Sequence, residues 1–424
     1  MITVEIITIG DELLIGQVID TNSSWMSREL NSIGFDVRYK TTVGDDECDI
    51  LDAFGRALER AEAVLVTGGI GPTNDDITKK MLCRFFNTSL IFDEKTLETV
   101  QSVVCGLGKE LNELTRNQAY VPQNCTVIQN RFGTAPITWF ETKGRVLVSM
   151  PGVPYEMKGV MREEILPRLQ TFFHPDDTIL HRTFWVKNYG ESLLAMHLET
   201  FENELPPFIK LAYLPTSGLI RLRLTGKGTD AEELSLQMEI HRKKLLACLE
   251  NAIVSEIDED LENILDKQLK EKKLTLALAE SCTGGKLASL FTAIPGCSNY
   301  FKGGIVCYSN EIKQKLLGVD SSLLNQYGAV SQQVVESMAT GAYRVFDTDC
   351  IIAISGIAGP DGGTPEKPVG TIWIAVYCKG RIQSQLFHFS KNRENNILRA
   401  CNNGIQMLLE IINEDLFGIY TGIV

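Results

Sequence analysis

Long hydrophobic runs are missing from this chain of 424 residues. Its longest apolar segments, such as AVLVT at 63–67 and CIIAI at 350–354, have the length of a β-strand and are too short to cross a membrane. The N-terminal sequence MITVEIITIGDELL lacks the basic start and the small-residue cleavage site of a secretory signal. We therefore expect a cytoplasmic protein without a membrane partner.

Paired cysteines and clustered histidines are also missing. The 11 cysteines are scattered singly, without any CxxC, and the 5 histidines show no metal-ligand spacing. These patterns argue against a disulfide framework and a structural zinc site, and they favour reduced, mostly buried thiols. Catalysis that depends on a Ser-His pair is therefore not expected.

An excess of basic residues is the third absence. The formal net charge is −13, and an acidic surface repels the phosphates of a duplex, so we expect no nucleic-acid partner. The sequence also lacks heptads, repeats and low-complexity tracts. Because the chain is too long for a single core, two or three domains are expected.

Short apolar runs alternate with helical patterns in two regions, 1–173 and 258–417, which predicts mostly parallel sheets covered by helices. Residues 178–252 differ, because two alternating strands, IKLAYL and LIRLRLTG, lie between helical stretches. The predicted fold class is α/β: two three-layer α/β domains with mostly parallel sheets, joined by a small α+β module.

Three strand ends in the first region are followed by a turn and a helix: TIGDE at 8–12, VTGGIGPTNDD at 66–76 and MPGVP at 150–154. Glycines let a ligand approach the backbone, and a helix start directs N–H groups at an anion such as phosphate. Parallel strand ends share one edge of a sheet, where ligands bind. The candidate nucleotide-site residues are Gly10, Asp11, Glu12, Gly68, Gly69, Gly71, Thr73, Pro151 and Gly152.

Asp75 and Asp76 permit two interpretations. Carboxylates beside a phosphate repel it unless a divalent cation lies between them or they bind hydroxyls, which makes both residues candidate metal ligands. Alternatively, Thr73 or Asn74 caps the following helix and the two acids complement its dipole.

The stretch AESCTGG at 279–285 places Ser281 between an apolar strand and a helix start, whose free N–H groups could stabilise an oxyanion. GGIVCYSNEIK at 303–313 supplies Tyr308 and Lys313, and a partly desolvated lysine can take a proton from serine. The structural alternative is that Ser281 caps a helix, Tyr308 is a core aromatic and Lys313 is solvated. We interpret Cys282 as a packing residue without a histidine partner.

A long loop with many glycines and prolines, within ISGIAGPDGGTPEKPVGT at 354–371, connects two further apolar strands. Long shaped loops inside compact domains are usually functional. Downstream, Arg393 near the start of the last helix could clamp a phosphate through its planar fork of donors.

The segments GDE, TGGIGPTNDD and MPGVP together resemble the molybdopterin-binding MoaB/Mog domain, in the version that opens proteins of the CinA (competence/damage-inducible) family. This resemblance implies a phosphate-bearing nucleotide ligand and hydrolysis of ADP-ribose with a divalent metal ion. A molybdopterin-type binder and a dimerisation scaffold are the alternatives for this domain, here given as 1–173.

AESCTGG, GGIVCYSNEIK and SGIAGPDGGTPEKPVGT resemble the C-terminal domain of the same family, a nicotinamide-nucleotide amidohydrolase. The resemblance implies that Ser281 attacks the carboxamide of nicotinamide mononucleotide (NMN), that Tyr308 and Lys313 assist, and that no cofactor is needed. The substrate-binding residues it implies are Thr283, Gly284, Gly285, Asn310, Ser355, Gly359, Gly362, Gly363, Thr364 and Arg393.

The whole chain then resembles an enzyme of pyridine-nucleotide salvage that acts on NMN and ADP-ribose. We expect a homodimer, and the linking module at 178–252 has no chemistry that the sequence reveals. A non-catalytic, competence-linked regulatory protein is the alternative outside the enzymes.

Overall fold

The computed structural model describes residues 2–73, 76–175, 177–216 and 218–417. Its internal contacts divide the chain into two compact units. The first comprises Met1–Leu180 with Gly226–Gln237, and the second comprises His181–Thr225 with Met238–Val424. Each unit contains an α/β domain with a mostly parallel sheet, so the predicted fold class is confirmed. None of the helices within the described ranges combines the length and the apolar character needed to cross a membrane.

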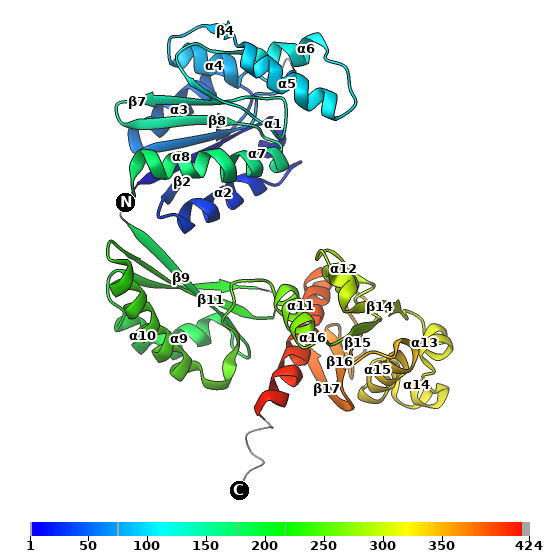
Figure 1. The fold of residues 1–424 in the computed structure, drawn as a ribbon. Helices are drawn as coiled ribbons and strands as arrows, with labels where there is room; N and C mark the ends of the chain where they lie inside the picture. The colour runs from blue at the N-terminus through cyan, green and yellow to red at the C-terminus, as the bar shows by residue number, and fades with distance from the viewer. Residues whose placement is uncertain (1, 74–75, 176, 217, 418–424) are drawn as a thin grey trace. The chain divides into compact units, whose positions relative to one another are not determined.

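The first domain is built on a six-stranded sheet with the order β2-β1-β3-β8-β7-β6 (Figure 1). Its strands are β1 (Thr3–Ile9), β2 (Asp36–Val43), β3 (Ala63–Thr67), β6 (Thr126–Ile128), β7 (Ile137–Thr142) and β8 (Arg145–Met150). β1, β2, β3 and β8 are parallel, whereas β6 and β7 run antiparallel at one edge. The central strands β1 and β3 are buried on both faces because helices cover both sides of the sheet.

The helices of this domain form two layers (Figure 1). One core cluster packs α2 (Thr21–Ser32), α7 (Pro154–Val160), η2 (Met161–Ile165) and α8 (Leu166–Phe173) on the sheet. The other packs α3 (Glu47–Arg60) and α4 (Thr78–Phe85) on the opposite face. The remaining elements are α1 (Asp11–Leu14), β4 (Leu90–Phe92), α5 (Glu94–Gly106), α6 (Glu113–Arg116), η1 (Asn117–Ala119) and β5 (Tyr120–Pro122).

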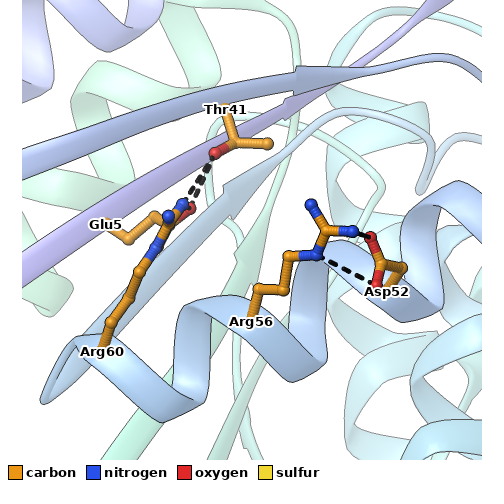
Figure 2. Close-up of polar contacts among 5 residues, drawn as sticks. All are labelled: Glu5, Thr41, Asp52, Arg56 and Arg60. Carbon is orange, nitrogen blue, oxygen red and sulfur yellow. Dashed lines mark hydrogen bonds and ion pairs between the residues drawn. The ribbon is translucent and has the colours of Figure 1, made fainter.

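A buried carboxylate on β1 forms an ion pair with an arginine of α3. Glu5 on β1 is 1% exposed and accepts hydrogen bonds from Arg60 Nε at 2.8 Å, Arg60 Nη2 at 2.7 Å and Thr41 Oγ1 at 2.7 Å. Figure 2 shows this cluster beside the pair of Arg56 and Asp52, which lies along the exposed side of α3. The two arginines on one helix therefore occupy different environments, since only Arg60 compensates a buried charge.

The linking region forms a four-stranded sheet with the order β10-β11-β9-β12. Its elements are β9 (Thr178–Val186), α9 (Glu191–Asn203), β10 (Ile209–Pro215), β11 (Ile220–Gly228), α10 (Ala231–Leu249), η3 (Glu250–Ala252) and β12 (Ile253–Ser255). The sequence patterns indicated only β10 and β11. β9 was missed because its run TILHRTFWV does not alternate cleanly between polar and apolar residues, and β12 because it has only three residues.

The last domain has a five-stranded sheet with the order β14-β13-β15-β16-β17. Its strands are β13 (Leu276–Glu280), β14 (Phe301–Val306), β15 (Cys350–Gly356), β16 (Thr371–Cys378) and β17 (Arg381–His388). The first three are parallel, while β16 and β17 continue as antiparallel hairpins, and β17 was not among the predicted strands.

Helices again cover both faces of this sheet. α11 (Leu261–Glu271), α12 (Lys286–Thr292) and α16 (Arg393–Phe417) share one core cluster. α13 (Asn310–Leu317), α14 (Ser321–Tyr327) and α15 (Gln332–Phe346) share the other, and η4 (Cys297–Asn299) precedes β14. The carboxyl ends of β13, β14 and β15 therefore lie side by side, where the predicted serine, tyrosine and lysine segments begin.

Candidate functional site

Ser281 and Lys313 meet at the carboxyl edge of the second sheet. Ser281 directly follows β13, and Lys313 lies one turn inside α13, whose start is capped by the Ser309 side chain. Lys313 Nζ lies 2.9 Å from Ser281 Oγ, and the two side chains belong to residues 1% and 8% exposed. The structure thus brings together two residues that are 32 positions apart in the sequence.

Lys313 Nζ has three hydrogen-bonding neighbours. Besides the Ser281 hydroxyl, Nζ lies 2.7 Å from the carbonyl oxygen of Cys307 and 3.2 Å from that of Tyr308. Both carbonyls can only accept hydrogen bonds, so a neutral amine would donate its two N–H groups to them. A protonated amine would donate to all three oxygens, whereas the lone pair of the neutral form would point at Ser281 Oγ, as a base needs in order to accept the serine proton.

Burial favours this neutral form. Desolvation lowers the pKa of Lys313 from its ordinary value. Among the described residues, no carboxylate lies within ion-pair distance of Nζ to restore the charge. Lys313 is therefore a buried amine held by two carbonyls, and the solvated-lysine interpretation of the sequence is wrong.

The start of α12 is occupied by a carboxylate that the sequence analysis overlooked. Glu280, at the end of β13 and 1% exposed, accepts hydrogen bonds from the N–H groups of Gly285 (3.0 Å), Leu287 (3.1 Å) and Ala288 (2.9 Å). The N–H of Gly284 donates to Ser281 O. The expectation that the Gly284 and Gly285 N–H groups face an oxyanion is therefore wrong, because both are already bonded within the turn.

Thr283 offers a free donor in their place. It is 3% exposed, and its hydroxyl has no hydrogen-bond partner within the described part of the chain. Its side chain also lines a cavity of about 440 Å³ together with Lys286, Arg393 and Glu394. An unpaired buried hydroxyl costs free energy, so Thr283 is a candidate hydrogen-bond donor at this end of β13.

Cys282 lies in the core rather than at the site. It belongs to the apolar cluster under α12 and α16, and burial raises its pKa to about 12. A thiol with that pKa is protonated at neutral pH and is a poor nucleophile. The structure therefore agrees with its interpretation as a packing residue.

The side chains of Tyr308 and Arg393 lie close to each other. The Tyr308 ring is 61% exposed, and its hydroxyl lies 3.4 Å from Arg393 Nη2, while Arg393 Nη1 donates to Gly359 O at 2.7 Å. No hydrogen bond joins the Tyr308 hydroxyl to Ser281 or Lys313 among the contacts of the described chain. The hydrogen bond between Lys313 and Tyr308 goes to the backbone carbonyl of Tyr308.

The loop between β15 and β16 is held by local contacts and by α16. Asn396, fully buried on α16, donates to Ala358 O at 3.0 Å and to Ser390 O at 2.8 Å. The N–H of Thr364 donates to Lys367 O at 2.9 Å, which closes the loop on itself. The asparagine was not singled out in the sequence because NN pairs inside a helix carry no distinctive pattern.

The other predicted substrate residues occupy varied positions. Ser355 is buried, and its hydroxyl donates to Ala329 O at 2.7 Å. Asn310 is the exposed first residue of α13. Gly359 and Gly362 have φ values of +92° and +90°, and a Cβ at Gly363 would lie 2.7 Å from Val369 N. The glycines therefore determine the path of the loop, and Arg393 reaches it with a charged group.

The first domain has a separate cavity of about 380 Å³ at its parallel strand ends. Seven predicted residues line it: Glu12, Gly68, Gly69, Gly71, Asp76, Pro151 and Gly152. Gly10, Asp11 and Thr73 are not among its lining residues. Asp11 instead exchanges hydrogen bonds of 3.2 Å with Asp45.

Asp76 forms hydrogen bonds within the loop before α4 and does not cap the helix, which begins at Thr78 with Ile77 as its N-cap and has no side-chain cap. Its carboxylate accepts hydrogen bonds from Gly71 N at 2.7 Å, from Thr73 N at 2.8 Å and from the Thr73 hydroxyl. Asp75 lies outside the described residues. Across the described ranges, no group of three or more His, Cys, Asp and Glu side chains could hold a metal ion.

Glu156 is a lining residue that the sequence analysis missed. It is partly buried in the same cavity, and its carboxylate accepts a hydrogen bond of 2.9 Å from the buried Asn130. Desolvation raises its pKa. The signal was present in MPGVPYEM, where a glutamate lies two residues after the proline that opens α7.

The fold and its two sites define a two-domain α/β protein, with one domain of the molybdopterin-binding type and a second that carries a buried Ser-Lys pair. Family comparisons agree: residues 5–171 match the "Probable molybdopterin binding domain" and residues 258–412 match the "CinA C-terminal domain". The chain belongs to the CinA family.

Its relatives match over nearly their full length. A CinA-like protein of Flavobacterium psychrophilum is 44% identical, over 96% of this chain and 98% of its own. A CinA-like protein of Cytophaga hutchinsonii is 43% identical, over 93% and 94%. The crystal structure of a CinA superfamily protein from Klebsiella pneumoniae is 34% identical, covers 36% of this chain and 96% of its own, and has a TM-score of 0.36.

Proposed function

We propose that the C-terminal site is a serine amidohydrolase that converts NMN and water into nicotinate mononucleotide and ammonia. The observation that supports it most is the buried pair of Ser281 Oγ and Lys313 Nζ at 2.9 Å, with the amine held by two carbonyls. A hydrolase that works through a serine nucleophile needs a base within hydrogen-bond reach of the serine hydroxyl. Cys282, whose pKa is raised to about 12, is not a competing nucleophile.

The reaction proceeds in two halves. Neutral Lys313 accepts the proton of Ser281 Oγ as the oxygen attacks the carboxamide carbon, and the resulting ammonium returns the proton to the departing nitrogen, which leaves as ammonia. Lys313 then accepts a proton from water, whose oxygen attacks the acyl-serine ester, and Ser281 recovers its proton as the carboxylate is released. We assign the hydrogen bond to the oxyanion to the Thr283 hydroxyl, which is buried and has no partner among the described residues.

The charge around the site favours a phosphate-bearing substrate. Lys286 and Arg393 line the cavity that Thr283 also lines, and the Arg393 guanidinium is anchored by Gly359 O. Two cations facing a cavity match the phosphate of a mononucleotide, although Glu394 on its rim carries the opposite charge. The Tyr308 hydroxyl beside Arg393 is placed to contact the ribose or the phosphate.

The decisive experiment incubates the purified protein with NMN and follows ammonia and nicotinate mononucleotide. Ser281→Ala should abolish turnover, while Cys282→Ala should keep it. Retention with Ser281→Ala and loss with Cys282→Ala would invert the nucleophile. No ammonia from the wild type would remove the proposal and favour the regulatory alternative.

For the first domain we propose a phosphate-bearing nucleotide as ligand, with ADP-ribose hydrolysis as the activity. The cavity between the ends of β1, β3 and β8 supports it, because Gly68 and Gly69, with φ values of +110° and +64°, bring backbone to the lining. The test incubates the protein with ADP-ribose, without metal and with Mg²⁺, Mn²⁺ or Co²⁺ in turn, and follows AMP. Binding of ADP-ribose without release of AMP would mean that the domain only binds the nucleotide. The absence of both binding and AMP would mean that it is a scaffold. The homodimer stays a prediction, checked by sedimentation.

A further inference from the structure

A second cleft lies inside the C-terminal unit, between the linking sheet and α16. It has a volume of about 470 Å³ and is lined by three segments: Tyr189–Glu191, 215–220 without residue 217, and Asn395 with Arg399 on α16. None of these residues belongs to the Ser281 site or lines the cavity around Thr283. The cleft is therefore a separate feature of this unit.

Core packing and an ion pair connect the walls of this cleft. Trp185 and Leu219 from the linking sheet are buried in the same core cluster as the apolar face of α16. Lys187 Nζ lies 2.5 Å from Glu410 Oε1, farther along the same helix. A Cβ on Gly218 would lie 3.0 Å from Asn403 Nδ2, so the loop approaches α16 closely. The shape of the cleft is therefore determined by packing.

Arg399 is the basic residue among the described residues that line the cleft, and it forms no ion pair with a described carboxylate. Its Nε is buried without a hydrogen-bond partner, and among the described residues no carboxylate lies within ion-pair distance of its guanidinium. The guanidinium carbon lies 4.5 Å above the ring of Phe389, which covers one face. The donors at the edge of the guanidinium stay available, and a buried unpaired arginine donor is costly unless an anion completes it.

The start of α9 adds a second attraction for an anion. Gly190 is the N-cap of this 13-residue helix, and no side chain caps it. Gly190 and Glu191 line the cleft together with Arg399, so the positive end of a helix and a guanidinium share one space. Glu191 is the acidic residue among the lining residues and weakens this attraction.

We propose that the cleft between α9 and α16 is an anion-binding site for the phosphate group of a small molecule, with Arg399 as its principal ligand. Thr216 and Asn395 supply neutral polar side chains around it, and Tyr189 supplies an aromatic ring for the organic part of the ligand. This proposal does not depend on the reaction at Ser281.

The test titrates the full chain with inorganic phosphate by calorimetry. The wild-type titration measures phosphate binding at all sites together. The difference between the wild-type titration and that of each variant gives the binding at the cleft. Arg399→Gln should weaken phosphate binding at one site at least tenfold. Glu191→Gln should tighten it about threefold or more, because it removes the opposing charge. Arg344→Gln, which removes an exposed arginine of α15, should leave the titration unchanged.

A second variant, Asn395→Asp, tests the cleft even if Arg399→Gln fails to fold. This substitution is isosteric and adds a negative charge to the lining. It should weaken the same site as Arg399→Gln does. The proposal is overturned if the wild type shows no phosphate binding up to about 10 mM, if Arg399→Gln and Asn395→Asp leave it unchanged, or if Arg344→Gln lowers it equally.

Discussion

Replacing Lys313 by methionine is the sharpest test of the Ser-Lys pair. Methionine fills a similar volume but has no basic nitrogen, so Ser281 Oγ loses the group 2.9 Å away that accepts its proton. A positioned general base contributes about 10²–10⁴-fold to a rate. We expect kcat/KM for NMN to fall about 10³-fold, which corresponds to about 4 kcal/mol of transition-state stabilisation.

The same substitution should leave the protein folded. The carbonyls of Cys307 and Tyr308 lose their donor, and each unsatisfied buried acceptor costs about 1–3 kcal/mol. Removing a desolvated amine offsets part of this cost, so we expect the free energy of unfolding to fall by about 2 kcal/mol. Urea denaturation measures this loss beside the activity assay, and Lys315→Met, an exposed residue of the same helix, is the matched control.

The pH dependence of kcat/KM and of the stability gives a second test of the Ser-Lys pair. Because the base must be neutral, kcat/KM of the wild type should rise with pH through a pKa that burial holds below about 10.4. Between that pKa and about 10.4 the unfolded lysine binds more protons than the folded one, so the wild type gains stability relative to Lys313→Met as pH rises through this window.

Two results would refute this reasoning. One is a folded Lys313→Met variant whose kcat/KM lies within threefold of the wild type. The other is a wild-type stability that falls, relative to the variant, as pH rises toward 10. Either result would mean that Lys313 is a structural amine and that another group takes the serine proton.

Three further predictions concern other contacts. Arg393→Lys should raise KM for NMN about tenfold in steady-state assays, because lysine lacks the planar fork of donors. KM for nicotinamide riboside, which has no phosphate, should stay unchanged. Equal losses on both substrates would contradict a phosphate role. Glu280→Gln should lower the free energy of unfolding in urea by about 2–3 kcal/mol, because three N–H groups lose a charged acceptor; an unchanged midpoint would contradict it. Arg60→Gln should cost on the order of 3 kcal/mol by leaving Glu5 buried and unpaired. Its control Arg56→Gln should cost about 0.5 kcal/mol or less (Figure 2), and similar values for the two would refute the difference in burial.

Much of the fold was predictable because it depends on local patterns. The continuous apolar runs of β1, β3, β13 and β15 indicate strands buried on both faces, and glycine-bearing turns separate them from helices. The antiparallel strands at the sheet edges were harder to predict. β17 is exposed along most of its length and has no apolar alternation, so its pairing with β16 is what makes it a strand.

The candidate site divides in the same way. Sequence motifs alone determined that a serine, a tyrosine and a lysine follow neighbouring strand ends, since the carboxyl ends of parallel strands share an edge. Only the tertiary structure decided that Lys313 is buried against Ser281, that the Tyr308 hydroxyl turns to Arg393, and that Glu280 takes the helix N–H groups. Protonation and hydrogen bonding depend on what surrounds a side chain, and those surroundings come from segments far apart in the chain.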